Sequence, residues 1–319
     1  MSSFDSIPLI DLSDTDGLPE RLISAYANVG FAYIAGHGVP EGLVDGIFEA
    51  ARRFHALPME RKMALALDAN HRGFIPIDSS TDRTSTLAKV TKPNQSESFM
   101  VMREANADDA DVVEGAFLAG PNQWPDLSGF RETVEAYQHA MVALAERVMS
   151  AFATGLGVRP ETLDNLFRPP TLWLRLLHYP PQKAASPDDL YGSAPHTDWG
   201  AITILAQDDV GGLQVMTPGG DWVDAPPISG TFVLNVGDML HRLSNGILKS
   251  TPHRVINRSG RERYSCPFFY DPSVSARISP LPETVTDARE AAYPPLVYGD
   301  FLRHQLGSTY DSHATESVL

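Results

Sequence analysis

The sequence predicts a mainly β core with flanking helices, an α+β fold, on three observations. After residue 171, short runs rich in β-branched and aromatic residues follow one another, each bounded by Gly, Pro, Asn or Asp. Many short strands at this spacing are typical of a β-sandwich or a barrel. Before that point, apolar residues recur at helical spacing instead. The chain has 319 residues, 43% of them hydrophobic, which is enough for a large buried core.

The N-terminal half is expected to be largely helical. Helical spacing of apolar residues covers 18–29, 41–56 and a longer stretch from about 129 to 156. A short strand is expected over residues 7–12, and the run GFAYIAGHGVP is strand-like up to a glycine-rich turn. A last helix is expected after the Pro-Pro pair that ends at Pro295. The predicted strands of the C-terminal half are TLWLRLLHY, AITILAQ, GLQVMT, TFVLNV, HRVIN and RYSCPFFY.

Composition limits the partners and the location. The net charge is −15 and there is no cluster of Lys and Arg, which argues against nucleic-acid binding. No apolar run is long enough to span a bilayer, and no secretory signal is recognisable, so we expect no membrane association. The single cysteine, Cys266, excludes a disulfide framework and a zinc-thiolate site within one chain, and it fits a reducing cytoplasm. We expect it to be a small buried apolar residue.

Two histidines and an aspartate have the pattern of a metal site. In PHTDWG, His196 and Asp198 are two residues apart, so a strand presents both on one face. His253, in STPHRVIN, follows after 253 − 198 = 55 positions, enough for several strands to return the chain. Two imidazoles and one carboxylate on one face of a metal suit iron(II) enzymes that must also bind a co-substrate and dioxygen. A His-x-Asp pair also arises by chance, so the surrounding motifs decide whether these residues are interpreted as a metal site.

The motif RYS, ten residues after His253, adds a carboxylate-binding group. Arg263 and Ser265 lie on one face of a predicted strand. The planar fork of an arginine donates two parallel hydrogen bonds to a carboxylate, and a serine hydroxyl adds a third. Such a group would hold the distal carboxylate of a dicarboxylic keto-acid. Tyr179, in LRLLHYPP, is placed to donate a further hydrogen bond to that carboxylate. The alternatives are a surface arginine and an ordinary core tyrosine.

Candidate substrate residues follow from strand parity and position. Arg175 shares the face of Tyr179, so it either binds an acidic group of the substrate or forms a structural ion pair. Phe269 shares the face of Arg263 and is expected to form an apolar wall, and Trp199 is expected at the entrance. Phe99 and the segment HRGFIPI are expected to fold over the mouth as a lid. For each aromatic residue the alternative is simple core packing.

Together these motifs resemble the isopenicillin N synthase-like branch of the iron(II)/2-oxoglutarate oxygenases. IPLIDLS and VGFAYIAGHGV are similar to the N-terminal region of that family, and HTDWG, PHRV and RYS are similar to its metal and co-substrate motifs. The resemblance implies a double-stranded β-helix, or jelly-roll. It implies a non-haem dioxygenase N-terminal region over residues 1–120 and a jelly-roll region with the long helix and the C-terminal helix over residues 121–319, in one compact unit. His37, in the GHGV turn, is interpreted as structural.

The resemblance also implies an activity. Fe(II) would be held by the catalytic residues His196, Asp198 and His253, and 2-oxoglutarate by Arg263 and Ser265 with Tyr179. Such an enzyme hydroxylates, desaturates or cyclises a small organic substrate with dioxygen and releases succinate and carbon dioxide. Plant members often carry Asn where this chain has Leu177, which removes a polar contact to the co-substrate.

Three alternatives stay open at this point. One is an oxidase that needs Fe(II) and dioxygen without 2-oxoglutarate, because relatives of that kind carry a similar Arg-x-Ser motif. A second is a non-catalytic small-molecule binding protein on the same fold. A cupin-like isomerase is the third, but it would not need the arginine. Neither the substrate nor the oligomeric state follows from these residues.

Overall fold

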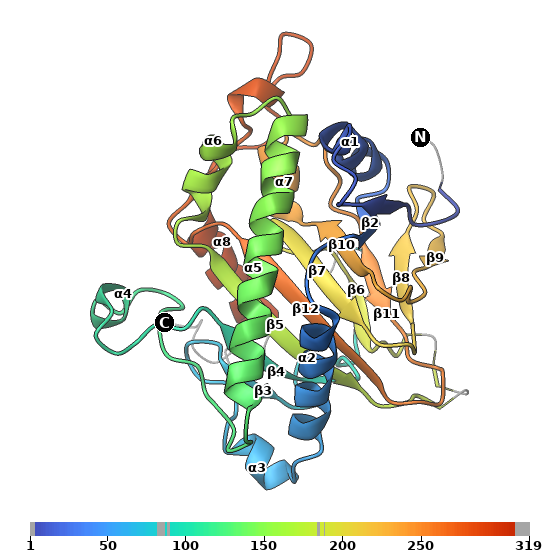
Figure 1. The fold of residues 1–319 in the computed structure, drawn as a ribbon, viewed down its shortest axis with the longest axis vertical. Helices are drawn as coiled ribbons and strands as arrows, with labels where there is room; N and C mark the ends of the chain where they lie inside the picture. Colours follow the sequence, from blue (N-terminus) through green and yellow to red (C-terminus); the bar gives the residue numbers. More distant parts are fainter. Residues whose placement is uncertain (1–3, 82–86, 88–89, 184–185, 188, 310–319) are drawn as a thin grey trace.

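The computed structural model describes residues 4–309 except 82–86, 88–89, 184–185 and 188. Its core is two facing β-sheets, flanked by helices (Figure 1). The large sheet contains, in spatial order, β1 (Leu9–Asp11), β2 (Phe31–Ala35), β10 (Phe232–Val236), β7 (Ile202–Gln207), β12 (Arg263–Asp271), β5 (Thr171–Tyr179), β4 (Glu97–Met102) and β3 (Gly73–Ile75). The small sheet contains β6 (Ser193–His196), β11 (His253–Val255), β8 (Leu213–Met216) and β9 (Trp222–Asp224). This confirms the predicted β core with flanking helices.

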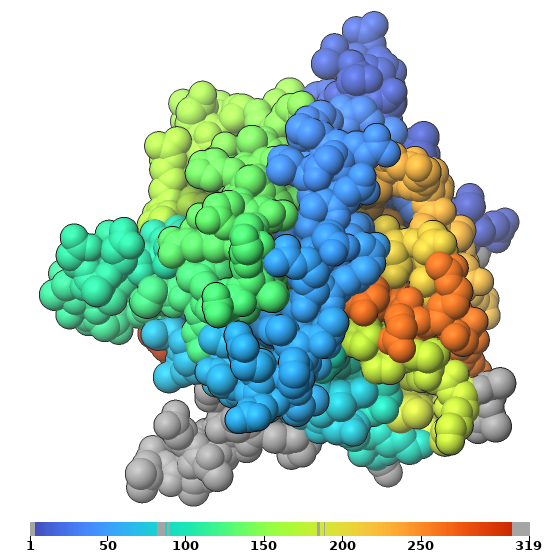
Figure 2. Space-filling view, turned by 60° about the horizontal axis from the view of Figure 1, so that its bottom comes forward, coloured from blue at the N-terminus to red at the C-terminus, as the bar shows by residue number. Residues whose placement is uncertain are grey.

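Helices cover the outer face of the large sheet. The longest, α5 (Phe130–Gly155), runs along the strands, with α1 (Leu18–Asn28) and α2 (Glu41–His55) beside it (Figure 1). Figure 2 shows α2 and α5 next to each other on this surface. The remaining elements are α3 (Met59–Met63), α4 (Ala110–Val113), α6 (Pro160–Asp164), α7 (Asp238–Leu243), α8 (Tyr298–Thr309), two short 3-10 turns (Asn165–Phe167 and Pro282–Thr284) and the paired β13 (Arg277–Ile278) and β14 (Leu296–Val297).

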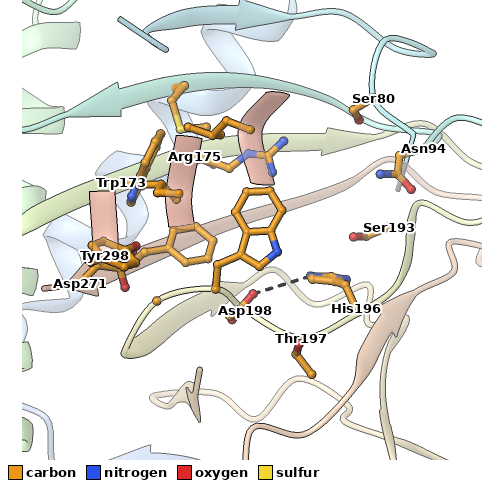
Figure 3. A pocket seen from close by; sticks show the side chains of 16 residues that line it. Ser80, Asn94, Trp173, Arg175, Ser193, His196, Thr197, Asp198, Asp271 and Tyr298 are labelled. Atoms are coloured by element: carbon orange, nitrogen blue, oxygen red, sulfur yellow. Dashed lines mark hydrogen bonds and ion pairs between the residues drawn. The ribbon is translucent and has the colours of Figure 1, made fainter. Parts of the chain in front are cut away.

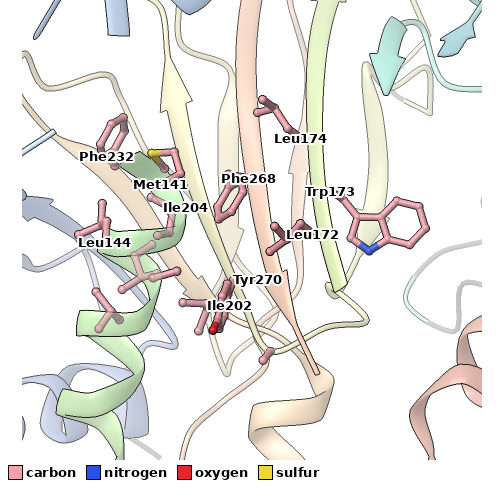
Figure 4. Packing of buried hydrophobic residues seen from close by; sticks show 14 of the residues in the cluster. Met141, Leu144, Leu172, Trp173, Leu174, Ile202, Ile204, Phe232, Phe268 and Tyr270 are labelled. Carbon is pink, nitrogen blue, oxygen red and sulfur yellow. The ribbon is translucent and has the colours of Figure 1, made fainter. Parts of the chain in front are cut away.

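The two faces of the large sheet carry different side chains. On the outer face, Met141 and Leu144 of α5 pack toward strand residues that include Ile204 and Phe268, whereas Trp173 points to the opposite side of β5 (Figure 4). On the inner face, a second apolar cluster includes Leu177 and residues of the small sheet. Successive strand residues point to opposite faces, so one alternating sequence supplies both layers. The inner layer is where the predicted site residues lie.

The predicted helices and the named strands are confirmed to within a few residues, but several strands were missed. Strand β4 shows no alternation because all six of its residues are buried. Phe99, in that strand, is fully buried and packs on Phe54 of α2 with ring centroids 4.3 Å apart. HRGFIPI contains β3, which pairs with β4 in the sheet. The prediction that Phe99 and this segment form a lid is therefore wrong, and both belong to the core. The division at residue 120 stays a prediction.

Two further sequence interpretations can be compared with the structure. His37 accepts a hydrogen bond from the backbone N–H of Val39 and packs on Phe232, as expected for a structural residue. Cys266 is fully buried, as expected. No helix in the described residues is long and apolar enough to cross a bilayer.

A buried ionic cluster ties the N-terminal helices to the sheet. The Glu97 carboxylate of β4 accepts from Lys62 at 2.8 Å and contacts His55 of α2 at 3.0 Å and His178 of β5 at 2.9 Å. The Lys62 and Glu97 side chains are only 7% and 8% exposed. An unpaired ammonium would be costly in this position.

We therefore expect Glu97→Gln to lower the free energy of unfolding by about 3–5 kcal/mol, because it leaves Lys62 buried without a counter-charge. Denaturant titration measures this. The matched control is Glu135→Gln, which breaks the exposed Arg131–Glu135 pair on α5 and should cost less than about 1 kcal/mol. Equal effects of the two substitutions would contradict the assignment of the cluster as a structural tie.

Candidate active site

The three predicted ligand residues converge on one point between the sheets. His196 is the last residue of β6, Asp198 follows two residues later, and His253 begins β11, directly opposite His196 in the strand pairing. The Nε2 atoms of both histidines lie 3.7 Å from Oδ1 of Asp198. The expected convergence is confirmed, although Asp198 lies just beyond the strand end rather than within it.

Hydrogen bonds orient both imidazoles toward that point. Nδ1 of His196 lies 2.7 Å from the carbonyl of Ala194, and Nδ1 of His253 lies 3.3 Å from the carbonyl of Thr251. A carbonyl can only accept, so we assign the proton to Nδ1, which leaves the lone pair of Nε2 facing Asp198. Burial, with His196 nearby, lowers the pKa of His253 to about 4, so its ring is neutral at pH 7. Two imidazoles and a carboxylate that share a centre fit a divalent cation.

Asp198 is held by its other oxygen. Oδ2 accepts hydrogen bonds from the side chains of Asn235 on β10, at 2.7 Å, and Thr203 on β7. Oδ1 is therefore the oxygen that faces the histidines. Sequence reasoning missed both supporting residues. Each is a polar residue between two apolar neighbours, in the runs TFVLNV and AITILAQ, but nothing local in the sequence links either of them to Asp198.

A fully buried arginine lies further along the inner face. Arg263 of β12 stands opposite Tyr179 of β5, and its guanidinium carbon is 4.6 Å from the centre of that ring. The guanidinium donates to Ser265 at 3.2 Å and to Gln207 at 3.3 Å, and its buried Nε has no partner. No carboxylate of a described residue forms an ion pair with it. A buried guanidinium with donors to spare fits the carboxylate of a bound dicarboxylic acid.

The strands that carry His253 and Arg263 do not form a hairpin with each other. β11 belongs to the small sheet and β12 to the large one, so the ten-residue step crosses between sheets. This crossing places the histidine and the arginine on facing walls. Leu177, at the position of the family's asparagine, lies opposite Ser265 in the β5–β12 pairing.

A cavity of about 150 Å³ opens beside His196 and Asp198 (Figure 3). The expected substrate residues Arg175, Trp199 and Phe269 line it, whereas Phe99 does not. Its lining consists of Ser80, Asn94, Met100, Trp173, Arg175, Ser193, His196, Thr197, Asp198, Trp199, Gly200, Phe269, Asp271, Tyr298, Leu302 and Leu306. The lining does not include Arg263, Ser265 or Tyr179. The buried arginine and the cavity therefore occupy successive parts of the inner face.

Asp271, at the end of β12, anchors the loop that follows Asp198. Its Oδ1 accepts from the backbone N–H of Ala201 at 2.8 Å, and its Oδ2 accepts from the hydroxyl of Tyr298 on α8 at 3.0 Å. Burial raises the pKa of Asp271 to about 7. A Cβ on Gly200 would lie 1.6 Å from Oδ1 of Asp271, so no larger residue fits there. Sequence reasoning missed this anchor, because nothing local links position 271 to position 200.

Comparison with known proteins covers nearly the whole chain. The model described as the 2OG-Fe(II) oxygenase superfamily matches residues 170–272, and the model described as the non-haem dioxygenase in morphine synthesis N-terminal matches residues 7–127. The 2-oxoglutarate-Fe(II) type oxidoreductase hxnY of Emericella nidulans is 37% identical over 95% of this chain and 90% of its own length. The chain belongs to the 2OG-Fe(II) oxygenase superfamily.

Solved structures agree with this assignment. A full-length Neurospora crassa protein, crystallised in complex with alpha-KG and thymine, has a TM-score of 0.81 and 31% identity, and the match covers 95% of this oxygenase and 96% of the Neurospora chain. JOX2, in complex with 2OG, Fe, and JA, has a TM-score of 0.80 and 28% identity and covers 98% and 89% of the two chains. The protein is thus a 2-oxoglutarate-dependent dioxygenase that uses Fe(II), 2-oxoglutarate and dioxygen. These relatives favour this function over an oxidase that needs no 2-oxoglutarate, and over a binding protein.

A second group of metal-ligand residue types in this oxygenase is the cluster of His55, Glu97 and His178. The possible ligand atoms of this cluster already have partners. Lys62 donates to both oxygens of Glu97, and Nε2 of His55 lies 2.9 Å from the carbonyl oxygen of Leu176. An ammonium on the shared carboxylate disfavours a cation there. Among the described residues, His196, Asp198 and His253 are therefore the better metal site.

We expect Gly200→Ala to weaken Fe(II) binding at least tenfold and to lower stability by about 1–3 kcal/mol, because the new methyl group must displace Asp271 and the loop that carries Asp198. Anaerobic metal titration and denaturant unfolding measure the two effects. Gly219→Ala is the matched control, since the nearest atom to its Cβ would be 3.6 Å away. Unchanged metal affinity in Gly200→Ala would contradict the anchoring role of Asp271.

Proposed function

We propose that His196, Asp198 and His253 hold the catalytic iron, and that Arg263 and Ser265, with the ring of Tyr179, bind the distal carboxylate of 2-oxoglutarate. One observation carries the proposal. Three metal-ligand atoms converge with their lone pairs inward, and a buried guanidinium with unused donors lies on the facing wall. A metal and a dicarboxylate are the two groups whose chemistry fits this arrangement.

When bound, the iron and the keto-acid supply the oxidising power, by coupling decarboxylation to the activation of dioxygen. The residues of the chain position and shield these groups. Asn235 and Thr203 fix Asp198 so that its Oδ1 faces the two histidines, and these three residues would hold the metal. The apolar inner cluster, with Leu177 and Val215, limits the access of water to the co-substrate.

The substrate is proposed to occupy the cavity beside His196 and Asp198. Phe269 and Trp199 supply apolar walls there, in support of a small organic molecule. Hydroxylation of a C–H bond is the default outcome, with desaturation and ring closure as variants. A cytoplasmic location is also part of the proposal, supported by the single, buried Cys266.

The test uses Arg263→Gln, which keeps two N–H donors but removes the charge. We expect its KM for 2-oxoglutarate to rise roughly 10- to 100-fold, the effect of losing a charged hydrogen bond in a buried site. Arg261→Gln is the matched control, because Arg261 lies two residues earlier and its side chain forms an exposed pair with Asp209. Both variants are assayed by succinate formation.

The same assay distinguishes the reaction types. In the wild-type enzyme, succinate should form in step with oxidised product once a substrate is present. Product without succinate would support the oxidase that needs no 2-oxoglutarate, and an unchanged KM in Arg263→Gln would refute the assignment of the arginine.

A further inference from the structure

Arg175 is a cation in the cavity, and the described residues provide no carboxylate paired with it. It lies near the middle of β5, lines the cavity, and donates from Nη2 to the hydroxyl of Ser98 at 2.9 Å. A guanidinium has five N–H donors. Nε of Arg175 is buried and unpartnered, and no described carboxylate forms an ion pair with it. The structural ion pair, which was the alternative interpretation of this residue, is therefore not found among the described residues.

Another buried arginine shows how a structural guanidinium behaves in this fold. The Nε of Arg72 is also buried without a partner, so the difference lies in the terminal nitrogens. Those of Arg72, which lines a separate cavity, donate to three backbone carbonyls, those of Asn70, Arg103 and Leu118. Arg175 has no such set of carbonyl partners. Its one hydrogen bond to a described residue orients the guanidinium and leaves most of its donors available to a ligand.

The carboxylates on the cavity wall are already engaged. Asp198 belongs to the proposed metal site, and Asp271 accepts from Ala201 and Tyr298. In Figure 3, Arg175 lies across the cavity from Asp198 and His196, with Asp271 and Tyr298 together on another side. The proposed iron is balanced by Asp198 and the keto-acid, and Arg263 takes the second carboxylate of that acid. Arg175 is then a charge for which no described residue of the cavity supplies an ion-pair partner.

We propose that the substrate is a small carboxylic acid whose carboxylate binds Arg175, and whose apolar body packs between Trp199, Phe269 and Met100. This inference rests on the proposed function of the same site. The cavity of about 150 Å³ has room for a body of this kind, since an engineered apolar cavity of about this volume holds one benzene molecule. A single ring or a short branched chain fits, and an amine would meet the positive charge of Arg175.

The test measures binding with defined probes. Benzoate, cyclohexanecarboxylate and 3-methylbutanoate are each compared with the primary amide of the same acid. The full-length enzyme is held without oxygen, with Fe(II) and saturating 2-oxoglutarate, so that the Arg263 site is occupied. Binding is followed by calorimetry and by the fluorescence of the cavity tryptophans. We expect at least one acid to bind roughly 10- to 100-fold more tightly than its amide, as for charged hydrogen bonds.

Variants assign that preference to one residue. Arg175→Gln should remove the preference for the acid and leave the affinity for the amide within about threefold, whereas Arg175→Lys, which keeps the charge, should retain the preference in part. Arg168→Gln, at an arginine whose side chain is 73% exposed, is the matched control and should behave as wild type. The melting temperature and the 2-oxoglutarate affinity of each variant show whether the fold and the co-substrate site are intact.

The outcomes separate this inference from the proposed function. Failure of the wild-type enzyme to bind Fe(II) or 2-oxoglutarate would refute the proposed function itself. If both bind, but no acid is preferred to its amide, or the preference survives in Arg175→Gln, then the substrate inference alone is overturned.

Discussion

The antiparallel pairing of β5 with β12 is the constraint on which the rest of the site depends. It sets Arg263 opposite Tyr179, Ser265 opposite Leu177 and Phe269 opposite Trp173. Because side chains alternate between faces, a slip of one residue would turn this inner row toward the helices and bring the outer apolar row into the site. Register is therefore strongly specified here, by apolar packing under α5 on one face and by the polar site on the other.

The inner face holds polar groups that would each destabilise the fold if left alone. Some of them are satisfied by hydrogen bonds within the chain. Asp198 accepts from Asn235 and Thr203. Asp271 accepts from Ala201 and Tyr298. Arg263 is different, because among the described residues its fully buried guanidinium donates only to the neutral side chains of Ser265 and Gln207. Buried charges are normally paired, so this guanidinium marks where an anionic ligand belongs. This contrast separates groups that hold the fold from groups that bind other molecules.

Much of the site followed from the sequence because its signals are short and local. Two-residue spacing predicted that His196 and Asp198 meet, and strand parity placed Arg175 and Phe269 on the cavity wall. Phe99 was misplaced because β4 is buried on both faces, so neither alternation nor exposure shows which way its side chains point. Asp271 and Asn235 were missed because their partners are distant in sequence, and only the folded register brings them together.

Crystallography of the anaerobic complex with Fe(II) and 2-oxoglutarate tests the account most directly, because anomalous scattering locates the iron. We expect one iron peak per chain, bounded by Nε2 of His196, Nε2 of His253 and Oδ1 of Asp198, with the distal carboxylate of 2-oxoglutarate on Arg263. An iron peak at His55, Glu97 and His178, or a co-substrate carboxylate away from Arg263, would contradict it.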